Sequence, residues 1–297
     1  MLIKVPASTS NLGPGFDCLG AALSIGLELR FTEGEASWTY EHGGLGPVHE
    51  PPDASLVLSA AARVLGETPS VALQMSSEIP MGCGLGSSAS AIAAGLLLGC
   101  AVDGREPDPE ELLVLGTPLE GHADNLAPAL FGGVTLVLPG FDGFDVLRFE
   151  PDPSIVPVIL LPQVTLSTSE ARRALPDHVE RVDAVKNIAR ASGLVALLSG
   201  TTQPTNDLLH ECTEDLLHQP YRAPLMPETA AAIEQLRAAG VPAAVSGAGP
   251  SIVCLLIRGE ESTARTEFKA LDGWQVLDLL WNLDGARIEV PDVGRSG

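Results

Sequence analysis

Residues 80–90, with the sequence PMGCGLGSSAS, place three glycines at alternate positions before two consecutive serines. Glycine lacks a Cβ atom, so the backbone at these positions can turn tightly and approach a ligand closely. Ser87 and Ser88 fall where the first turn of a following helix is expected. The unpaired N–H groups of a helical first turn attract anions. The segment therefore predicts a phosphate site at a helix N-terminus.

The same segment has a plainer interpretation, a strand–helix turn capped by a serine. Three alternating glycines followed by two serines are more than such a turn requires, which favours the phosphate site. No lysine follows the last glycine, so this is not a Walker A loop. The spacing also differs from G-x-G-x-x-G and from the G-x-S-x-G nucleophile elbow, which leaves a serine hydrolase as a weak alternative.

Two arginines stand out in a chain that has 17 lysines and arginines against 38 acidic residues. A guanidinium binds a carboxylate through two parallel hydrogen bonds, so Arg172 and Arg222 are candidates for holding an acidic group. Arg172 stands next to Arg173, so the residues alone favour a solvated helix face for it.

Other polar residues have both a chemical and a structural interpretation. His122, Asp124 and Asn125 precede an apolar run and fit either a helix cap or half of a metal site. Asn11 and Asp17 flank a glycine- and proline-rich turn, which uses such residues structurally in any case. An aspartate can also pair with an ammonium group.

Strand-like and helix-like segments alternate around these residues. Apolar residues at every second position predict a strand over 71–77. A run rich in alanine and leucine predicts a buried helix over 87–100. Other strands are expected over 133–138, 155–161, 243–246 and 251–257, and other helices over 228–239 and over 178–198, the latter with Val179, Val182, Val185 and Ile188 on one face.

The length of 297 residues suits two domains. Residues 139–157 contain four prolines and predict a crossing between domains. We therefore expect an α+β or mixed α/β chain with a boundary near residue 152, giving domains 1–152 and 153–297.

Composition excludes several classes of protein. A net charge of −21 argues against nucleic acid and anionic membranes as partners, because both require a basic surface. The five cysteines form no C-x-x-C pair, which argues against disulfide frameworks and structural zinc and favours a reducing cytoplasm. No signal-peptide stretch opens the chain, and the longest apolar run, 91–102, is too short to span a bilayer.

Three segments resemble, in order, the three signatures of the GHMP kinases: residues 6–20 (PASTSNLGPGFDCLG), residues 80–90, and residues 245–253 (VSGAGPSIV). Within that superfamily, residues 120–133 (EGHADNLAPALFGG), 168–172 and 215–222 are similar to segments of the homoserine kinases. Three ordered signatures that span almost the whole chain make the resemblance specific.

The resemblance implies a two-domain α+β kinase. Its N-terminal domain would be similar to the second domain of ribosomal protein S5, its C-terminal domain would be ferredoxin-like, and its site would lie in the cleft between them. The implied reaction transfers a phosphoryl group from ATP, with Mg²⁺, to the hydroxyl of L-homoserine, giving O-phospho-L-homoserine for threonine biosynthesis. Another small-alcohol kinase, or a silent relative that binds nucleotide without transfer, stays open, as does a homodimer.

The resemblance also implies roles for individual residues. Asn125 would orient the attacking hydroxyl in a direct attack, because an amide cannot act as a base, and His122, Asp124 and Ser88 would complete the catalytic group. The residues expected to bind substrate are Asn11, Asp17, Asn125, Thr168, Arg172 and Arg222. A supporting loop would contain Ser246, Gly247 and Gly249. The residues expected to bind ATP are Pro80, Met81, Gly82, Cys83, Gly84, Leu85, Gly86, Ser87, Ser88, Ala89 and Ser90.

The magnesium site implied by the resemblance is incomplete. Ser88 would supply one ligand and a glutamate on the following helix the other. Counting back along that helix from residue 121 places the expected glutamate at Val114, which has no carboxylate. Glu110, Glu111 and Glu120 stay open as replacements, and Mg²⁺ can also fill its shell with phosphate and water.

Overall fold

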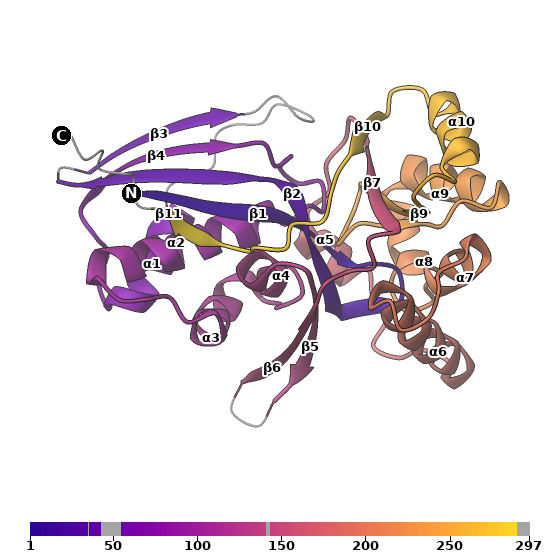
Figure 1. Cartoon of the computed structure of the whole chain (residues 1–297), viewed down its shortest axis with the longest axis horizontal. Coiled ribbons are helices and arrows are strands. Elements are labelled where there is room, and N and C mark those ends of the chain that lie inside the picture. Colours follow the sequence, from indigo (N-terminus) through magenta and orange to yellow (C-terminus); the bar gives the residue numbers. More distant parts are fainter. Residues whose placement is uncertain (35, 43–54, 141–142, 290–297) are drawn as a thin grey trace.

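The computed structural model describes residues 1–34, 36–42, 55–140 and 143–289, which form two β-sheets with their helices (Figure 1). The first sheet has seven strands. Its path runs β11 (Arg287–Glu289), β1 (Leu2–Asn11), β2 (Gly15–Glu33), β4 (Val71–Ser77) and β3 (Ser37–His42), and β2 also pairs with the hairpin of β5 (Val134–Pro139) and β6 (Phe144–Phe149). Only the β3–β4 pair is parallel.

Four helices cover one face of this sheet (Figure 1). They are α1 (Ser55–Leu65), α2 (Ser87–Asp103), α3 (Pro109–Glu120) and α4 (Leu126–Phe131). Helix α2 is the central one, and its residues from Ala89 to Cys100 are all buried. A helix that is apolar on all sides must lie inside its domain, which explains the alanine- and leucine-rich run.

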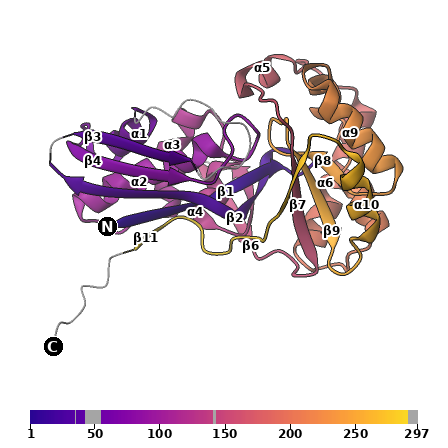
Figure 2. The same cartoon turned by 90° about the horizontal axis from the view of Figure 1, so that it is seen from above.

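The second sheet has four antiparallel strands in the order β10 (Gln275–Asp278), β7 (Ile155–Leu161), β9 (Ile252–Ile257) and β8 (Ala243–Val245). In chain order this is 4-1-3-2, the order of the ferredoxin-like fold. Figure 2 shows this sheet and its helices at the opposite end of the molecule from the first sheet.

Alternate residues of β7 and β9 divide between two cores, as the two-residue period of a strand requires. Val158 and Leu160 face a small core with α9 (Pro227–Ala238) and α10 (Ser262–Ala270). Ile159 and Leu161 belong to the large core that also receives α6 (Arg181–Leu198) and α7 (Asn206–Cys212). Short helices α5 (Thr168–Arg173), α8 (Gln219–Arg222) and η1 (Ala223–Leu225) lie in the connections.

After β10 the chain returns to the first sheet, along the yellow segment of Figure 1. Trp281 forms a bridge with Leu23 of β2, and its indole N–H donates to the Ile155 carbonyl of β7 at 2.8 Å. Strand β11 then pairs with the start of β1. The predicted boundary at residue 152 falls between the strands of the two sheets, β6 and β7, and stays a prediction. Residues 287–289 come after this boundary in the sequence, yet they lie in the first sheet.

The α+β class, the ferredoxin-like second half and most predicted elements are confirmed, and the likeness of the first half to ribosomal protein S5 stays a prediction. Residues 139–157 are more than a crossing, because β6 lies within them; positions 141 and 142 lie outside the described residues, as do 290–297 of the predicted second domain. Within the described residues, no helix has the length and apolar character needed to cross a membrane.

The predicted apolar face of the helix over 178–198 does not pack against the core. Helix α6 begins at Arg181, and Val182, Val185 and Ile188 are 60–66% exposed. These three side chains lie within about 120° of one another around the helix, on the side opposite its buried positions, so they face solvent. Its buried positions are Asn187, Leu194, Leu197 and Leu198.

Candidate active site

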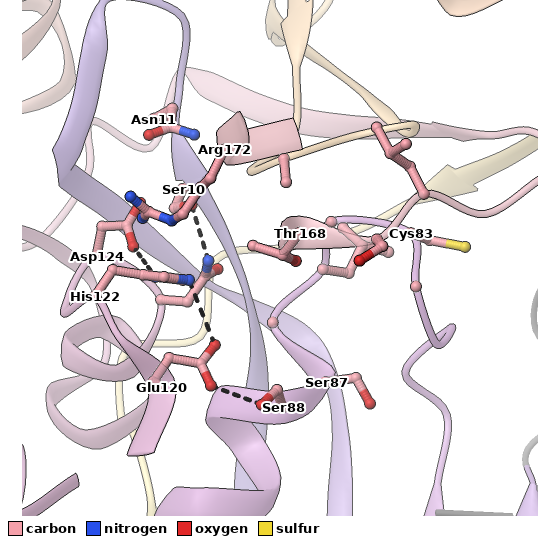
Figure 3. A pocket seen from close by; sticks show the side chains of 18 of the residues that line it. Ser10, Asn11, Cys83, Ser87, Ser88, Glu120, His122, Asp124, Thr168 and Arg172 are labelled. Carbon is pink, nitrogen blue, oxygen red and sulfur yellow. Dashed lines mark hydrogen bonds and ion pairs between the residues drawn. The ribbon is translucent and has the colours of Figure 1, made fainter. Parts of the chain in front are cut away.

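A cavity of about 260 Å³ opens where the two halves of the chain meet. Its wall combines the N-terminus of α2, the loop before α4, the first turn of α5, the end of β1 and the start of β2 (Figure 3). The lining residues are Ser10, Asn11, Asp17, Pro80, Gly82, Cys83, Gly84, Leu85, Gly86, Ser87, Ser88, Glu120, His122, Asp124, Asn125, Leu166, Ser167, Thr168, Arg172, Arg222 and Ala248.

The phosphate loop, residues 80–90, ends in the first turn of α2. Gly86 is the N-cap with φ of 70°, a left-handed conformation, and no side chain caps the helix. A Cβ atom on Gly86 would lie 2.2 Å from the Ser8 hydroxyl oxygen. Both the left-handed backbone and this close contact therefore require glycine at position 86. The helix begins at Ser87, and its first N–H groups have no partner in earlier turns. This end of α2 can therefore bind an anion.

Most residues predicted to bind ATP line the cavity, but Met81, Ala89 and Ser90 do not. Ala89 and Ser90 are buried in α2. The Ser90 hydroxyl donates to the Pro6 carbonyl at 2.8 Å and to the Gly86 carbonyl at 2.9 Å. Ser90 thus holds α2 against β1 and has no hydroxyl hydrogen left for a ligand.

Glu120 is the glutamate that lies beside Ser88. The Ser88 hydroxyl donates to a Glu120 carboxylate oxygen at 2.6 Å (Figure 3). Glu111 is paired with Arg105 at 2.9 Å, and Glu110 is exposed in the first turn of α3, about 15 Å along the helix from Glu120.

Position 114, where counting along the helix placed the expected glutamate, lies away from Ser88 and the cavity. Val114 is 44% exposed and does not line the cavity. It precedes Glu120 by six residues, which corresponds to about 9 Å along the axis and about 120° around it. Glu120 occupies the last position of α3, next to the left-handed Gly121, and its carboxylate points at the start of α2.

Glu120, His122 and Asp124 form a chain of buried charged groups. His122 Nδ1 lies 2.6 Å from Asp124, and Nε2 lies 3.8 Å from Glu120 (Figure 3). Burial would lower the pKa of His122, but the hydrogen bond and charge of Asp124 raise it above its usual value. Burial would raise the pKa of Asp124, yet the bond to His122 holds it below its usual range. Burial raises the pKa of Glu120, against the opposing bond from Ser88.

Asn125 follows this chain and is held by two serines of β1. The Ser8 hydroxyl donates to the Asn125 amide oxygen at 3.0 Å, and the Asn125 amide nitrogen donates to the Ser10 hydroxyl at 2.9 Å. Asn125 is buried and lines the cavity beside Gly86. Its amide thus has a fixed orientation close to the phosphate loop.

Asp17 and Arg172 meet on the other side of the cavity. Two guanidinium nitrogens of Arg172 donate to the two Asp17 oxygens at 2.7 and 3.0 Å. Burial lowers the pKa of Arg172 while this pair raises it, with a net shift upward. Both side chains are about one-third exposed, so each faces the cavity as well as its partner. Asp17 has φ of 60°, an uncommon conformation outside glycine.

Arg222 is almost fully buried, at 2% exposure, in the short helix α8. Its Nε donates to the Ala171 carbonyl at 3.3 Å, and Nη1 donates to the Gly247 carbonyl at 3.2 Å and to His218 Nδ1 at 3.1 Å. Burial, and then the nearby charge of Arg172, lower the pKa of Arg222.

The 246–250 loop joins β8 and β9 and contacts the two other signature segments. The Ser246 hydroxyl bonds to Thr9 and donates to the Gly84 carbonyl at 2.8 Å. The Gly247 carbonyl accepts from the Asn11 amide at 2.7 Å, and the Asn11 amide oxygen accepts from the Asp17 N–H at 2.9 Å. Both ends of the Asn11 amide are thus used within the protein, although Asn11 lines the cavity.

Family models and individual relatives show which family this chain belongs to. The family described as "GHMP kinases N terminal domain" matches residues 55–133, and "GHMP kinases C terminal" matches residues 194–271. A homoserine kinase of Streptomyces avermitilis is 40% identical, with 96% of this chain and 94% of the relative covered. One of Streptomyces coelicolor is 42% identical, with 96% and 93% covered.

This chain belongs to the homoserine kinase family of the GHMP kinases. The crystal structure of a homoserine kinase from Cytophaga hutchinsonii superposes on it with a TM-score of 0.78 at 27% identity, covering 97% of both chains. Phosphomevalonate kinase of Streptococcus pneumoniae, 15% identical with a TM-score of 0.74, shares the fold.

Several residues around the site of this homoserine kinase family member were missed from the sequence. Ser8 and Ser10 fix Asn125, and their signal is present in the first signature, where consecutive small polar residues lie in a buried strand. Phe16 stacks on His218 with ring centroids 5.2 Å apart. His218 lies within residues 215–222, which the family resemblance had already marked, so its position in that segment was the signal that could have found it.

Proposed function

We propose that this protein is a homoserine kinase that transfers the γ-phosphoryl group of ATP to the hydroxyl of L-homoserine. One observation carries the proposal: a single cavity holds the phosphate loop on one wall and the Asp17–Arg172 pair, with Arg222, on another. Membership of the homoserine kinase family supports the same substrate.

The charged groups of homoserine match the second wall. In the structure Asp17 and Arg172 neutralise each other, and a zwitterionic amino acid offers each of them a group of opposite charge. We assign the substrate ammonium to Asp17 and the carboxylate to Arg172 and Arg222. Thr168, at the start of α5, adds a hydroxyl at the same wall.

The catalytic group works by positioning. Asn125 cannot accept a proton as a base, so in the proposed mechanism its fixed amide orients the substrate hydroxyl for direct attack. The N–H groups at the start of α2 would stabilise charge on the transferring phosphoryl group, which has a loose transition state. His122 and Asp124, bonded to each other, would keep the Asn125 segment and Glu120 in place.

The donor set beside the phosphate loop fits Mg²⁺. Ser88 supplies a hydroxyl and Glu120 a carboxylate, and Mg²⁺ binds hard oxygen ligands while keeping waters and substrate phosphates. Across the described residues no group of three or more His, Cys, Asp or Glu side chains could hold a metal ion by itself, which suits an ion shared with ATP. When bound, Mg²⁺ neutralises charge on the phosphate oxygens.

Two finer points belong to the proposal. We place the enzyme in the cytoplasm, consistent with five free cysteines, four of them buried. The choice between a monomer and a homodimer stays open.

A panel of alcohols in a coupled ADP-release assay tests the proposed function. L-Homoserine should be phosphorylated with a kcat/KM at least about a hundredfold above mevalonate, shikimate or L-serine. Turnover of mevalonate or shikimate without homoserine would identify another small-alcohol kinase. Thermal stabilisation by ATP without ADP release from any acceptor would identify a silent relative.

A further inference from the structure

His218 is a buried histidine that lies behind the cavity and does not line it. Its side chain is 0% exposed, and its ring connects two parts of the chain that are distant in sequence. Nε2 lies 2.9 Å from the Gly13 carbonyl of the first signature segment. Nδ1 lies 3.1 Å from Nη1 of Arg222, one helical turn later in the chain.

The groups around the ring determine which nitrogen carries the proton. On the Nε2 side lie two acceptors, the Gly13 carbonyl and, at 3.5 Å, an Asp215 carboxylate oxygen that also accepts two main-chain N–H bonds. On the Nδ1 side lies a guanidinium, which can only donate. The proton is therefore on Nε2, and Nδ1 accepts from Arg222. Burial, together with the charge of Arg222 and against that of Asp215, lowers the pKa of His218, which is consistent with a neutral ring.

The hydrogen bonds of Arg222 leave one nitrogen for a ligand. Nε is used by Ala171, and both Nη1 hydrogens are used by His218 and Gly247. Within the described part of the chain Nη2 has no hydrogen-bond partner, and Arg222 lines the cavity. Phe16 stacks on the His218 ring, and the Arg222 guanidinium carbon lies 5.3 Å from the centroid of the Phe16 ring. The guanidinium therefore cannot tilt toward Phe16.

We propose that His218 is a positioning residue for amino acid recognition: its neutral Nε2–H ring, anchored on Gly13, fixes the guanidinium of Arg222 so that Nη2 points at the substrate carboxylate. This inference rests on the proposed function, because it takes the ligand of Arg222 to be a carboxylate. His218 would act on substrate binding and not on the phosphoryl group.

Three substitutions of His218 distinguish the role of the Nδ1 hydrogen bond from that of the Nε2 hydrogen bond. His218→Asn can place an amide oxygen near the Nδ1 position and keep the acceptor for Arg222. His218→Gln can place an amide N–H near the Nε2 position and keep the donor to Gly13. His218→Phe keeps an aromatic ring against Phe16 and removes both hydrogen bonds.

The KM for homoserine should rise about tenfold in His218→Gln and His218→Phe, and stay within about threefold of wild type in His218→Asn. The KM for ATP should stay unchanged in all three variants. In an Arg222→Ala background, His218→Gln should raise the homoserine KM by less than about twofold, because the group that it positions is gone. An equal rise in His218→Asn and His218→Gln, or additive effects with Arg222→Ala, would overturn the proposal.

A second measurement, made on the wild-type protein, does not depend on any substrate. Long-range ¹⁵N–¹H spectra of the imidazole, assigned with His218→Asn, should show an unprotonated Nδ1 and a protonated Nε2 at pH 7. A protonated Nδ1 would overturn the positioning role even if homoserine is the substrate. Absence of homoserine turnover in the wild type, with the expected spectrum, would instead reject the proposed function and leave the ring assignment standing.

Discussion

Individual charged residues in this site differ in whether the protein itself balances their charge. Asp17 is paired with Arg172, and Asp124 with His122. Arg222 has no carboxylate partner in the described part of the chain, only carbonyls and an imidazole nitrogen. A buried cation without a counter-ion is costly, so a ligand that brings a carboxylate gains affinity there.

Substitution Arg222→Ala should raise the KM for homoserine roughly 10- to 100-fold, the range for one or two charge-assisted hydrogen bonds. The KM for ATP should change little, because Arg222 lies on the amino acid wall. Arg237→Ala is the matched control, since Arg237 also donates to main-chain carbonyls, those of Ala243 and His210, away from the cavity. Initial-rate kinetics check this, and an equal loss for both substrates contradicts the role.

Glu120→Gln should raise the Mg²⁺ concentration required for half-maximal activity at least about tenfold, because an amide is a weaker ligand than a carboxylate. Glu111→Gln, which removes only an exposed partner of Arg105, is the control. Val114→Glu should leave the requirement unchanged, because position 114 lies outside the cavity. Titrations of Mg²⁺ at fixed ATP measure all three variants. A lower Mg²⁺ concentration for half-maximal activity in Val114→Glu than in the wild type would reject the Glu120 site.

At the scale of elements, the N-terminus of α2 depends on close contact with one strand and two loops. The Ser8 hydroxyl and the Asn125 amide lie against Gly86, and the Ser246 carbonyl would lie 2.2 Å from a Cβ atom on Gly84. The helix start, the Asn125 amide and the 246–250 loop are therefore packed as one unit, and a change in one should displace the others.

The two ends of α2 provide a matched pair of substitutions. Gly86 and Gly104 have φ of 70° and 71°, but a Cβ atom added at Gly86 would have neighbours within 4 Å, whereas one added at Gly104 would have none. Gly104→Ala should cost roughly 1–2 kcal/mol of unfolding free energy for its left-handed backbone alone. Gly86→Ala should cost more and raise the KM for ATP at least about tenfold, because the helix start must shift. Urea unfolding and ATP kinetics measure both, and equal effects would contradict the contact.

At the scale of the whole molecule, the segment after β10 joins the two halves. Trp281 pairs with β2 through its backbone and donates to β7 through its indole. The wall of the cavity comes from both halves, so this joint also sets the distance between the phosphate loop and the amino acid wall.

Trp281→Phe should lower the unfolding free energy by about 1 kcal/mol, the usual contribution of one hydrogen bond. The ring that remains still packs against the large core. Trp274→Phe, in the small core of the second sheet, is the control that keeps the joint intact. Denaturant unfolding followed by circular dichroism gives the values, and no loss in Trp281→Phe would show that the indole bond is not needed for stability.

Much of this arrangement could be predicted from the sequence, because signature segments carry local physics. The glycines of residues 80–90 specify left-handed backbone, and the apolar run after them specifies a buried helix. Contacts between segments that are distant in the sequence could not be predicted in this way, because no local pattern specifies them. Counting along α3 placed the expected glutamate at Val114, which lies outside the cavity and about 120° around the helix from Glu120. The exposure of Val182 and Ile188 depends on which face of α6 meets the core.

The pairing of β11 with β1 has a consequence for how the protein is made. Residues 2–4 pair with residues 287–289. This strand pair at the edge of the first sheet therefore cannot form until residue 289 has been synthesised. At ordinary translation speeds that delay is about 15 to 60 s. During that time β1 offers an open strand edge to other chains, and the nascent protein should depend on chaperones more than its final stability suggests.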